Sequence, residues 1–196
     1  RASGRMAAVT TTSGPGVANV TAALGQATTD NVPMVVISSG PSAALIGRNR
    51  GGLHDLNDAI ELAQPACRYV AHADAVEEIS PKLAQLIRNL RCMRPGGAFI
   101  QVPTNILGAS ADVTICSSDG QRPAPDMKTV AVAAELLQTA RRPLIIAGYG
   151  ALLAGAGPAI QALAERLDAV VATTTLARGL LGEQSWVVFD DGAVPS

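Results

Sequence analysis

The feature that most constrains the fold is a regular alternation of short apolar runs with helix-like segments. Residues 34–37 (MVVI) follow Pro33 as an unbroken apolar run, which is typical of a strand buried on both faces of a sheet. Residues 75–90 instead place Val76, Ile79 and Leu83 on one helical face. Because helices cover both faces of a parallel sheet, this alternation predicts an α/β fold with parallel sheets.

The chain contains two such series, separated by a segment of different character. The predicted strands are residues 6–12, 34–37, 98–102, 144–147 and 169–173, and the predicted helices are residues 17–28, 75–90, 127–139 and 159–167. Residues 104–126 are interrupted by prolines and lack periodicity, so we interpret them as a linker between domains at residues 1–103 and 127–196. Since the chain opens on Arg1 and ends soon after the last apolar run, we expect both units to be truncated.

Charge and cysteine content exclude several classes of protein. The 15 basic and 16 acidic residues give a formal net charge of −1, which argues against nucleic acid as a partner. No apolar run approaches the ~18 residues of a membrane helix, so we expect no membrane partner. The 3 cysteines form no CxxC pair and only 2 histidines are present, so we expect no metal site, buried or half-buried reduced thiols and a cytoplasmic protein.

One glycine-rich turn directly follows the first predicted strand. Residues 12–19 (TSGPGVAN) lead from that strand into a helix, and ligands of parallel α/β sheets bind at this edge of the strands. Gly14 and Gly16 permit a sharp turn, Pro15 fixes φ, and the free N–H groups of the helix face any ligand. An ordinary strand-to-helix turn explains the same local pattern.

Two further motifs each allow a functional and a purely structural interpretation. Gly148 and Gly150 follow a predicted strand and would admit a nucleotide, but the spacing is not that of GxGxxG, and a plain turn explains it equally. His54 stands beside Asp55 in a polar loop, where it would transfer a proton, orient a substrate or simply face solvent.

Taken in order, four blocks resemble thiamine diphosphate-dependent enzymes of the acetolactate synthase type. Residues 9–19 (VTTTSGPGVAN) resemble the family segment VTSGPGxxN, and residues 30–38 (DNVPMVVIS) resemble the DxxPxxxI strand after it. Residues 94–103 (RPGGAFIQVP) resemble RPGPVxxxxP at the end of the pyrimidine-binding domain. Residues 142–150 (RPLIIAGYG) resemble RPxxxAGxG at the start of the Rossmann-like central domain.

The resemblance implies a role for each residue of the glycine-rich turn. Thr12, Pro15 and Asn19 would line the pocket for the aminopyrimidine ring of thiamine diphosphate, and Gly14 and Gly16 would shape the turn. Mg²⁺ would be bound by a domain absent from this chain, and the catalytic glutamate would lie upstream of its first residue.

The resemblance also assigns the other two motifs. Where relatives carry a Phe-Gln pair facing the active centre, this chain has Leu53 and His54, so His54 is the candidate catalytic residue. Gly148 and Gly150 would contact FAD in members that bind a flavin. The resemblance leaves open whether this chain binds FAD and whether it serves branched-chain amino acid biosynthesis.

The function implied is that of a 2-oxo acid decarboxylase or carboligase, a lyase or transferase. By this resemblance the chain supplies the pyrimidine side of the cofactor site to a homo-oligomer whose active site lies at a subunit interface. The fragment alone is expected to be inactive. A non-catalytic nucleotide-binding or assembly module is the alternative.

Overall fold

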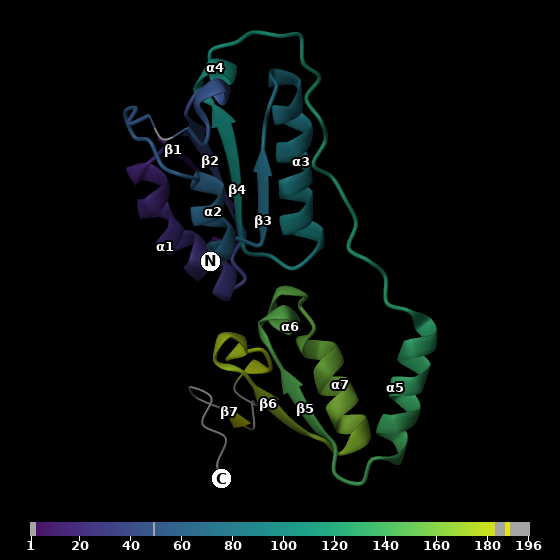
Figure 1. Cartoon of the computed structure of the whole chain (residues 1–196). Coiled ribbons are helices and arrows are strands. Elements are labelled where there is room, and N and C mark those ends of the chain that lie inside the picture. Colours follow the sequence, from purple (N-terminus) through teal and green to yellow (C-terminus); the bar gives the residue numbers. More distant parts are fainter. Residues whose placement is uncertain (1–2, 49, 183–186, 189–196) are drawn as a thin grey trace. The chain divides into compact units, whose positions relative to one another are not determined.

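The computed structural model describes residues 3–48, 50–182 and 187–188, and the chain divides into two compact units, Arg1–Pro123 and Ala124–Ser196. Each unit has its own parallel sheet flanked by helices (Figure 1). The predicted fold class, two α/β units with parallel sheets, is confirmed. The domain limits drawn from the sequence, 1–103 and 127–196, stay a prediction.

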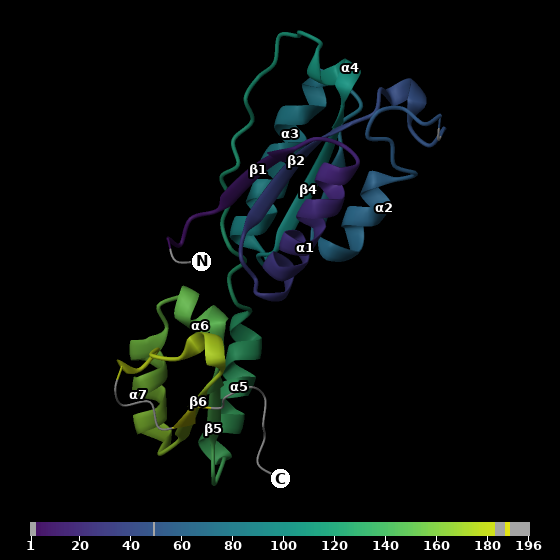
Figure 2. The ribbon, with the colours of Figure 1, turned by 90° about the vertical axis from the view of Figure 1, so that its left-hand side faces the viewer.

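The first unit is a four-stranded sheet with helices on both faces. Its elements are β1 (Ala7–Thr11), α1 (Pro15–Thr29), β2 (Met34–Gly40), η1 (Ala43–Leu45), α2 (Ala59–Ala63), η2 (Gln64–Ala66), β3 (Tyr69–His72), α3 (Val76–Cys92), β4 (Gly97–Pro103) and α4 (Thr104–Leu107). The strands lie in the order β1-β2-β4-β3, and every pair is parallel. α1 and α2 cover one face of this sheet and α3 covers the other (Figures 1 and 2).

The core of the first unit forms on both faces of the central strands. Val36 and Phe99, both fully buried, pack against α1 and α2. Ile100 and Val102 point to the opposite face and pack against α3. The strand β4 is buried along its whole length, which is why its sequence shows no polar alternation.

The connections of the first unit reverse direction between β2 and β4. The loop after β2 leads to α2 on one face of the sheet, and the chain after β4 leads to α4, whose Ile106 joins the core on the other face. Neighbouring parallel strands whose connections leave to opposite faces define a topological switch point, where ligands of α/β sheets bind.

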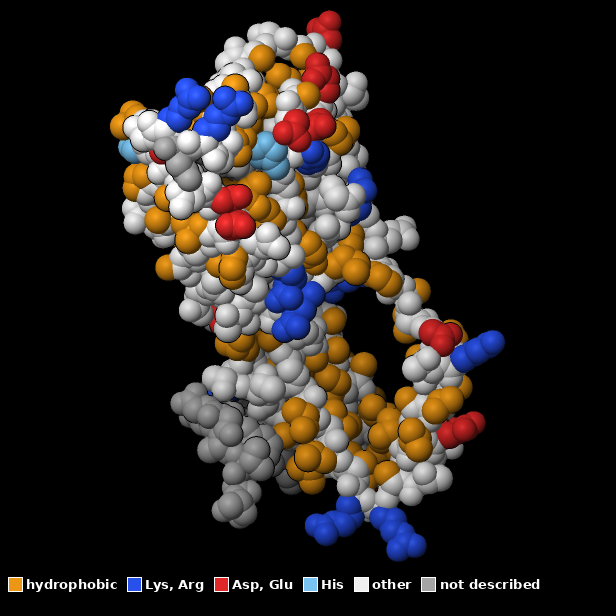
Figure 3. Space-filling model, viewed as in Figure 1, with side chains coloured by type: hydrophobic (Ala, Val, Ile, Leu, Met, Phe, Trp, Pro, Cys, Tyr) orange, Lys and Arg blue, Asp and Glu red, His pale blue; other side chains and the backbone are white. Residues whose placement is uncertain are grey.

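The second unit is smaller and has a more exposed apolar surface. Its elements are α5 (Met127–Thr139), β5 (Leu144–Ala147), α6 (Tyr149–Leu153), α7 (Gly157–Leu167), β6 (Val170–Thr173), η3 (Thr175–Ala177) and β7 (Val187–Val188), with strand order β5-β6-β7. Leu144, Ile146 and Val170 share one sheet face and are each at least half exposed. Apolar side chains also stand exposed on α5 (Figure 3).

The observed elements match the predicted ones most closely in the second unit. The helix α5 and the strand β5 begin and end at the predicted residues, whereas α1 begins two residues earlier than predicted, at Pro15. The sequence analysis missed α2, α6 and β3. The last of these has only four residues, YVAH, and no turn signal before it.

The segment after α4 has no regular structure through Pro125 but is held to α3. Arg88 donates from Nε to the carbonyl oxygen of Asp119 at 2.9 Å and from Nη2 to that of Ser117 at 3.0 Å. Ser80 accepts the backbone N–H of Cys116 at 2.7 Å. These bonds explain why the first compact unit extends through Pro123, into the segment interpreted as a linker.

Within the described residues, no helix is both long enough and apolar enough to cross a membrane.

Candidate functional site

The glycine-rich turn lies at the carboxyl end of β1 and opens α1. Gly14 is the N-cap residue with φ 62°, a left-handed backbone that glycine adopts without a Cβ penalty. Pro15 begins the helix, where its missing N–H leaves no hydrogen bond unmade. The backbone N–H of Ser13 donates to Ser39 Oγ at 3.0 Å, which ties the turn to the end of β2.

The loop after β2 lies over this turn and brings His54 to it. A Cβ built on Gly14 would lie 2.5 Å from the carbonyl oxygen of His54. The Nδ1 atom of His54 lies 3.2 Å from Thr12 Oγ1, within hydrogen-bonding distance. His54 itself has φ 58°, which is uncommon for a non-glycine residue and often marks a functional site. The fold therefore joins three of the predicted site residues, Thr12, Gly14 and His54.

The other residues of the turn differ in their environment. A Cβ at Gly16 would collide with the Thr11 hydroxyl, so a larger residue there would first have to displace that side chain. Asn19 lies one turn into α1 and is exposed, and its carboxamide has no hydrogen-bond partner among the described residues. Thr12 and Pro15 are also exposed. The N-terminal end of α1 thus presents polar atoms that are available to a ligand.

Behind the turn lies a hollow of about 10 Å³ that the sequence analysis did not anticipate. Gly14, His54, Asn57, Asp58 and Gln101 are among its lining residues. Asp58 is the N-cap of α2 and accepts the N–H groups of Ile60 and Glu61 at 2.8 and 3.0 Å. An Asp directly before an apolar run is a recognisable helix start, so Asp58 had a signal in the sequence. Gln101 had a weaker one, as the single polar residue of an apolar strand.

The predicted flavin residues, Gly148 and Gly150, lie at the carboxyl end of β5. Neither has a positive φ, and a Cβ on Gly150 would meet nothing within 4 Å. The fold of the second unit therefore does not itself require glycine at Gly150, and close approach of a ligand is one reason to find it there. Thr173 ends β6 next to them with a buried Oγ1 that has no partner among the described residues. The FAD contact stays a prediction.

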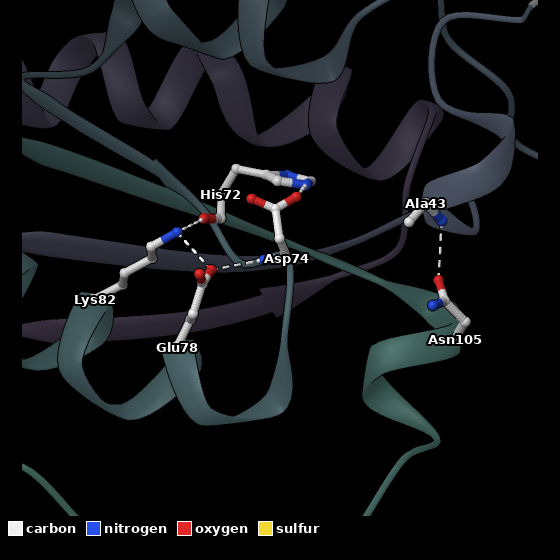
Figure 4. A network of polar contacts seen from close by, with 6 residues as sticks. All are labelled: Ala43, His72, Asp74, Glu78, Lys82 and Asn105. Atoms are coloured by element: carbon white, nitrogen blue, oxygen red, sulfur yellow. Dashed lines mark hydrogen bonds and ion pairs between the residues drawn. The ribbon is translucent and has the colours of Figure 1, made fainter.

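A separate polar network closes the N-terminal end of α3 (Figure 4). Glu78 accepts the backbone N–H of Asp74 at 2.9 Å and the Nζ of Lys82 at 2.7 Å. Lys82 also donates to the carbonyl oxygen of His72 at 2.6 Å, and His72 Nε2 lies 3.1 Å from Asp74 Oδ1. The Lys82 hydrogen bond and then the Asp74 N–H lower the pKa of Glu78 below its usual 4.5. Glu78 thus accepts a backbone N–H at the start of α3, where the N-cap residue Ala75 has no side-chain acceptor.

We expect Glu78→Gln to lower the stability of the first unit only above the acid range. A carboxyl group whose pKa is lowered on folding contributes stability above its unfolded pKa, here about 4.5, and loses it as the pH falls through the lower folded value. The gap in unfolding midpoint between the parent chain and the variant should therefore close on acidification. Denaturant titrations at a series of pH values measure it. Glu77→Gln, on the same turn, is the matched control, and a gap that persists in strong acid would contradict the prediction.

The described residues include potential metal ligands and a cysteine with a raised pKa. No group of three or more His, Cys, Asp or Glu side chains among them is placed to hold a metal ion. Cys67 is half-buried, and burial raises its pKa to about 12, so it is a thiol at neutral pH. Cys116 is exposed, which corrects the expectation that all three thiols are at least half-buried.

The comparisons with known proteins assign both units. Residues 1–62 match the family described as thiamine pyrophosphate enzyme, N-terminal TPP binding domain, and residues 130–188 match thiamine pyrophosphate enzyme, central domain. Together with the two parallel α/β units and the turn after β1, these matches show that the chain belongs to the thiamine pyrophosphate enzymes.

Its curated relatives include enzymes of several activities. The chain is 36% identical to a probable 2-ketoarginine decarboxylase of Pseudomonas aeruginosa, over 92% of this chain and 33% of that protein. It is 31% identical to an oxalyl-CoA decarboxylase of Escherichia coli, over 87% and 31%. It is 26% identical to a probable acetolactate synthase large subunit of Methanococcus aeolicus, over 93% and 31%. The chain thus spans about a third of the length of these relatives, and the acetolactate synthase type is one among several.

Proposed function

We propose that the chain is part of a thiamine diphosphate-dependent enzyme that decarboxylates 2-oxo acids or joins them to a second carbonyl compound. The observation that carries this proposal is the turn at Gly14, where His54 and Thr12 meet at the carboxyl edge of a parallel sheet. Decarboxylases are prominent among the relatives, and an acetolactate synthase is also found. We therefore favour decarboxylation, with carboligation as the activity to be tested beside it.

The residues of the turn fit a flat heteroaromatic ring with polar edges. The exposed, unpartnered carboxamide of Asn19 can both donate and accept a hydrogen bond, and Pro15 offers an apolar ring beside it. Thr12 and the N-terminal N–H groups of α1 add donors at the same edge. When bound, thiamine diphosphate supplies the carbon nucleophile and electron sink for 2-oxo acid chemistry. Mg²⁺ and the diphosphate would be held by residues outside this chain.

His54 would act on the substrate rather than help to bind the cofactor. Its Nδ1 is engaged with Thr12, while its other ring nitrogen makes no hydrogen bond within the described residues. The imidazole is thus held in place by one nitrogen and can exchange a proton or a hydrogen bond with a substrate through the other. His54 is the residue we propose for this role.

We expect Asn19→Ala to weaken thiamine diphosphate binding by the complete enzyme by about 1 kcal/mol, a roughly fivefold higher Kd. The loss is that of one hydrogen bond, because Asn19 is exposed and supports nothing else in the fold. Calorimetric titration with the cofactor and Mg²⁺ measures it. Gln26→Ala, on the same helix three turns away from the turn at Gly14, should leave the Kd unchanged.

An outcome in which the enzyme binds no thiamine diphosphate would favour the non-catalytic module. An unchanged Kd for Asn19→Ala in an enzyme that binds the cofactor would remove Asn19 from the pocket. Flavin absorbance of the same preparation tests the FAD contact at Gly148 and Gly150. The mass of the enzyme in solution tests the expected homo-oligomer.

A further inference from the structure

A row of polar side chains crosses the first sheet just beyond its apolar core. Thr11 pairs with Ser38, Ser38 with Gln101 and Gln101 with His72, so the four residues stand side by side on the four strands. Side chains alternate along a strand, so this row shares the α1 and α2 face with the buried Phe99 two residues earlier. The row therefore lies at the carboxyl edge of the sheet, on the face from which the turn at Gly14 departs.

Gln101 stands out within this row because it is buried and unpaired. The residue is only 4% exposed, and its carboxamide makes no hydrogen bond with any described residue. Its neighbour His72 has a buried Nδ1 that is also without a partner in the described part of the chain. Unlike that nitrogen, neither carboxamide atom of Gln101 is both buried and unpartnered, so the carboxamide stays accessible from the hollow that the residue lines. An unpaired carboxamide at a ligand-binding edge points to a partner that binds there.

The surroundings of Gln101 are shaped to leave room for its side chain. A Cβ on Gly40 would lie 2.8 Å from the Gln101 carboxamide carbon, so glycine at that position makes space for it. β2 and β4, which carry these two residues, flank the topological switch point of the sheet. Asn105 after β4 accepts the N–H of Ala43 after β2 at 2.9 Å, which joins the two connections across that point (Figure 4).

The hollow that Gln101 lines is the one behind the turn at Gly14, beside His54. Its volume of about 10 Å³ suits one group the size of a water molecule. Among the described residues no Lys or Arg lines it, and its one acidic residue is Asp58, whose Oδ1 is already engaged by α2. An anionic group would find no permanent cation there, whereas a neutral oxygen or nitrogen would find the carboxamide.

We propose that Gln101 is a specificity-determining residue whose carboxamide binds one uncharged polar group of the substrate, a hydroxyl, carbonyl or amide in its side chain. This assignment rests on the proposed function, because it takes the substrate to be a 2-oxo acid handled beside His54. The carboxamide hydrogen-bonds the far end of the substrate, and His54 and the cofactor act on the reacting carbon.

The test compares two 2-oxo acids of equal length, one ending in a hydroxyl and the other in a methyl group. In the complete enzyme, Gln101→Met should lower kcat/KM for the hydroxyl acid about 5- to 10-fold and change it less than about twofold for the methyl acid. Met matches Gln in length and volume, so the fold is retained. Gln64→Met, the same change at an exposed position of η2, should leave both values unaltered.

Gln101→Glu serves as a second variant that keeps the polarity and length of the side chain. It should lose at least as much activity on the hydroxyl acid, because a carboxylate adds repulsion beside Asp58 and has no N–H to donate. An equal loss on both acids, or no loss on either, in an enzyme that still binds thiamine diphosphate, would overturn the assignment. Absence of cofactor binding in the parent enzyme would instead defeat the proposed function.

Discussion

Replacing Phe99 with alanine is expected to lower the free energy of unfolding of the first unit by about 3–5 kcal/mol. Phe99 is fully buried in the central strand β4 and packs with Val17, Leu24 and Val36 under α1. Its removal takes apolar surface out of the core and leaves a cavity that strands and helix cannot both close. The loss is large because several elements share this one side chain.

Denaturant unfolding followed by circular dichroism measures the effect. Met93→Ala, at an exposed position after α3, is the control and should change stability by no more than about 0.5 kcal/mol. A loss below about 1 kcal/mol for Phe99→Ala would mean that this face of the sheet is not the core of the unit.

Replacing Gly14 with alanine is expected to displace the loop that carries His54. The backbone of Gly14, with φ 62° and ψ −115°, is a conformation that alanine rarely adopts, and a Cβ there would lie 2.5 Å from the His54 carbonyl oxygen. The backbone fixes the position of the Cβ, and its partner is a backbone carbonyl oxygen, so no side-chain rotation relieves the contact. The loop must move, and the contact between His54 and Thr12 is then lost.

Two measurements separate this local effect from general unfolding. The variant should become more susceptible to protease cleavage in the segment around Gly47–His54, and in the complete enzyme it should bind thiamine diphosphate more weakly. Gly52→Ala is a matched control in the same loop, because Gly52 has no positive φ and a Cβ there would meet nothing within 4 Å. Identical behaviour of the two variants would contradict the contact between turn and loop.

The two predictions separate the fold from the candidate site. Phe99 tests packing that any α/β unit of this kind needs, whereas Gly14 tests a contact between two loops that lie far apart in the sequence. Gly16→Val, a natural choice from the sequence alone, is a poorer test of cofactor binding, because a side chain at Gly16 already collides with Thr11.

The local sequence predicted those elements whose signals are local. The helix α5 follows Asp126, whose carboxylate accepts the N–H groups of Lys128 and Thr129 at 3.2 Å each, and the strand β5 follows Pro143 as an apolar run. Such caps and runs act within a few residues, so the sequence shows them directly. The glycine-rich turn after β1 was found for the same reason.

Local signals were missing for β3 and, apart from the cap at Asp58, weak for α2. The strand β3 has four residues and takes its conformation from pairing with β4, whose residues Ala98–Gln101 lie about 30 positions further along the chain. The helix α2 has five residues and depends on its cap at Asp58 and on burial of Ala59 and Ala63. For elements this short, tertiary contacts decide the conformation.

By itself, the sequence determined the alternation of strands and helices, the turn that ends β1 and the family to which the chain is similar, because each of these depends on neighbouring residues. Only the tertiary structure decided that His54 lies on Gly14 and that Gln101 stands unpaired behind them. The sheet order β1-β2-β4-β3 is the reason: it inserts β4 between β2 and β3 and so brings the loop after β2, the turn after β1 and the end of β4 to one edge.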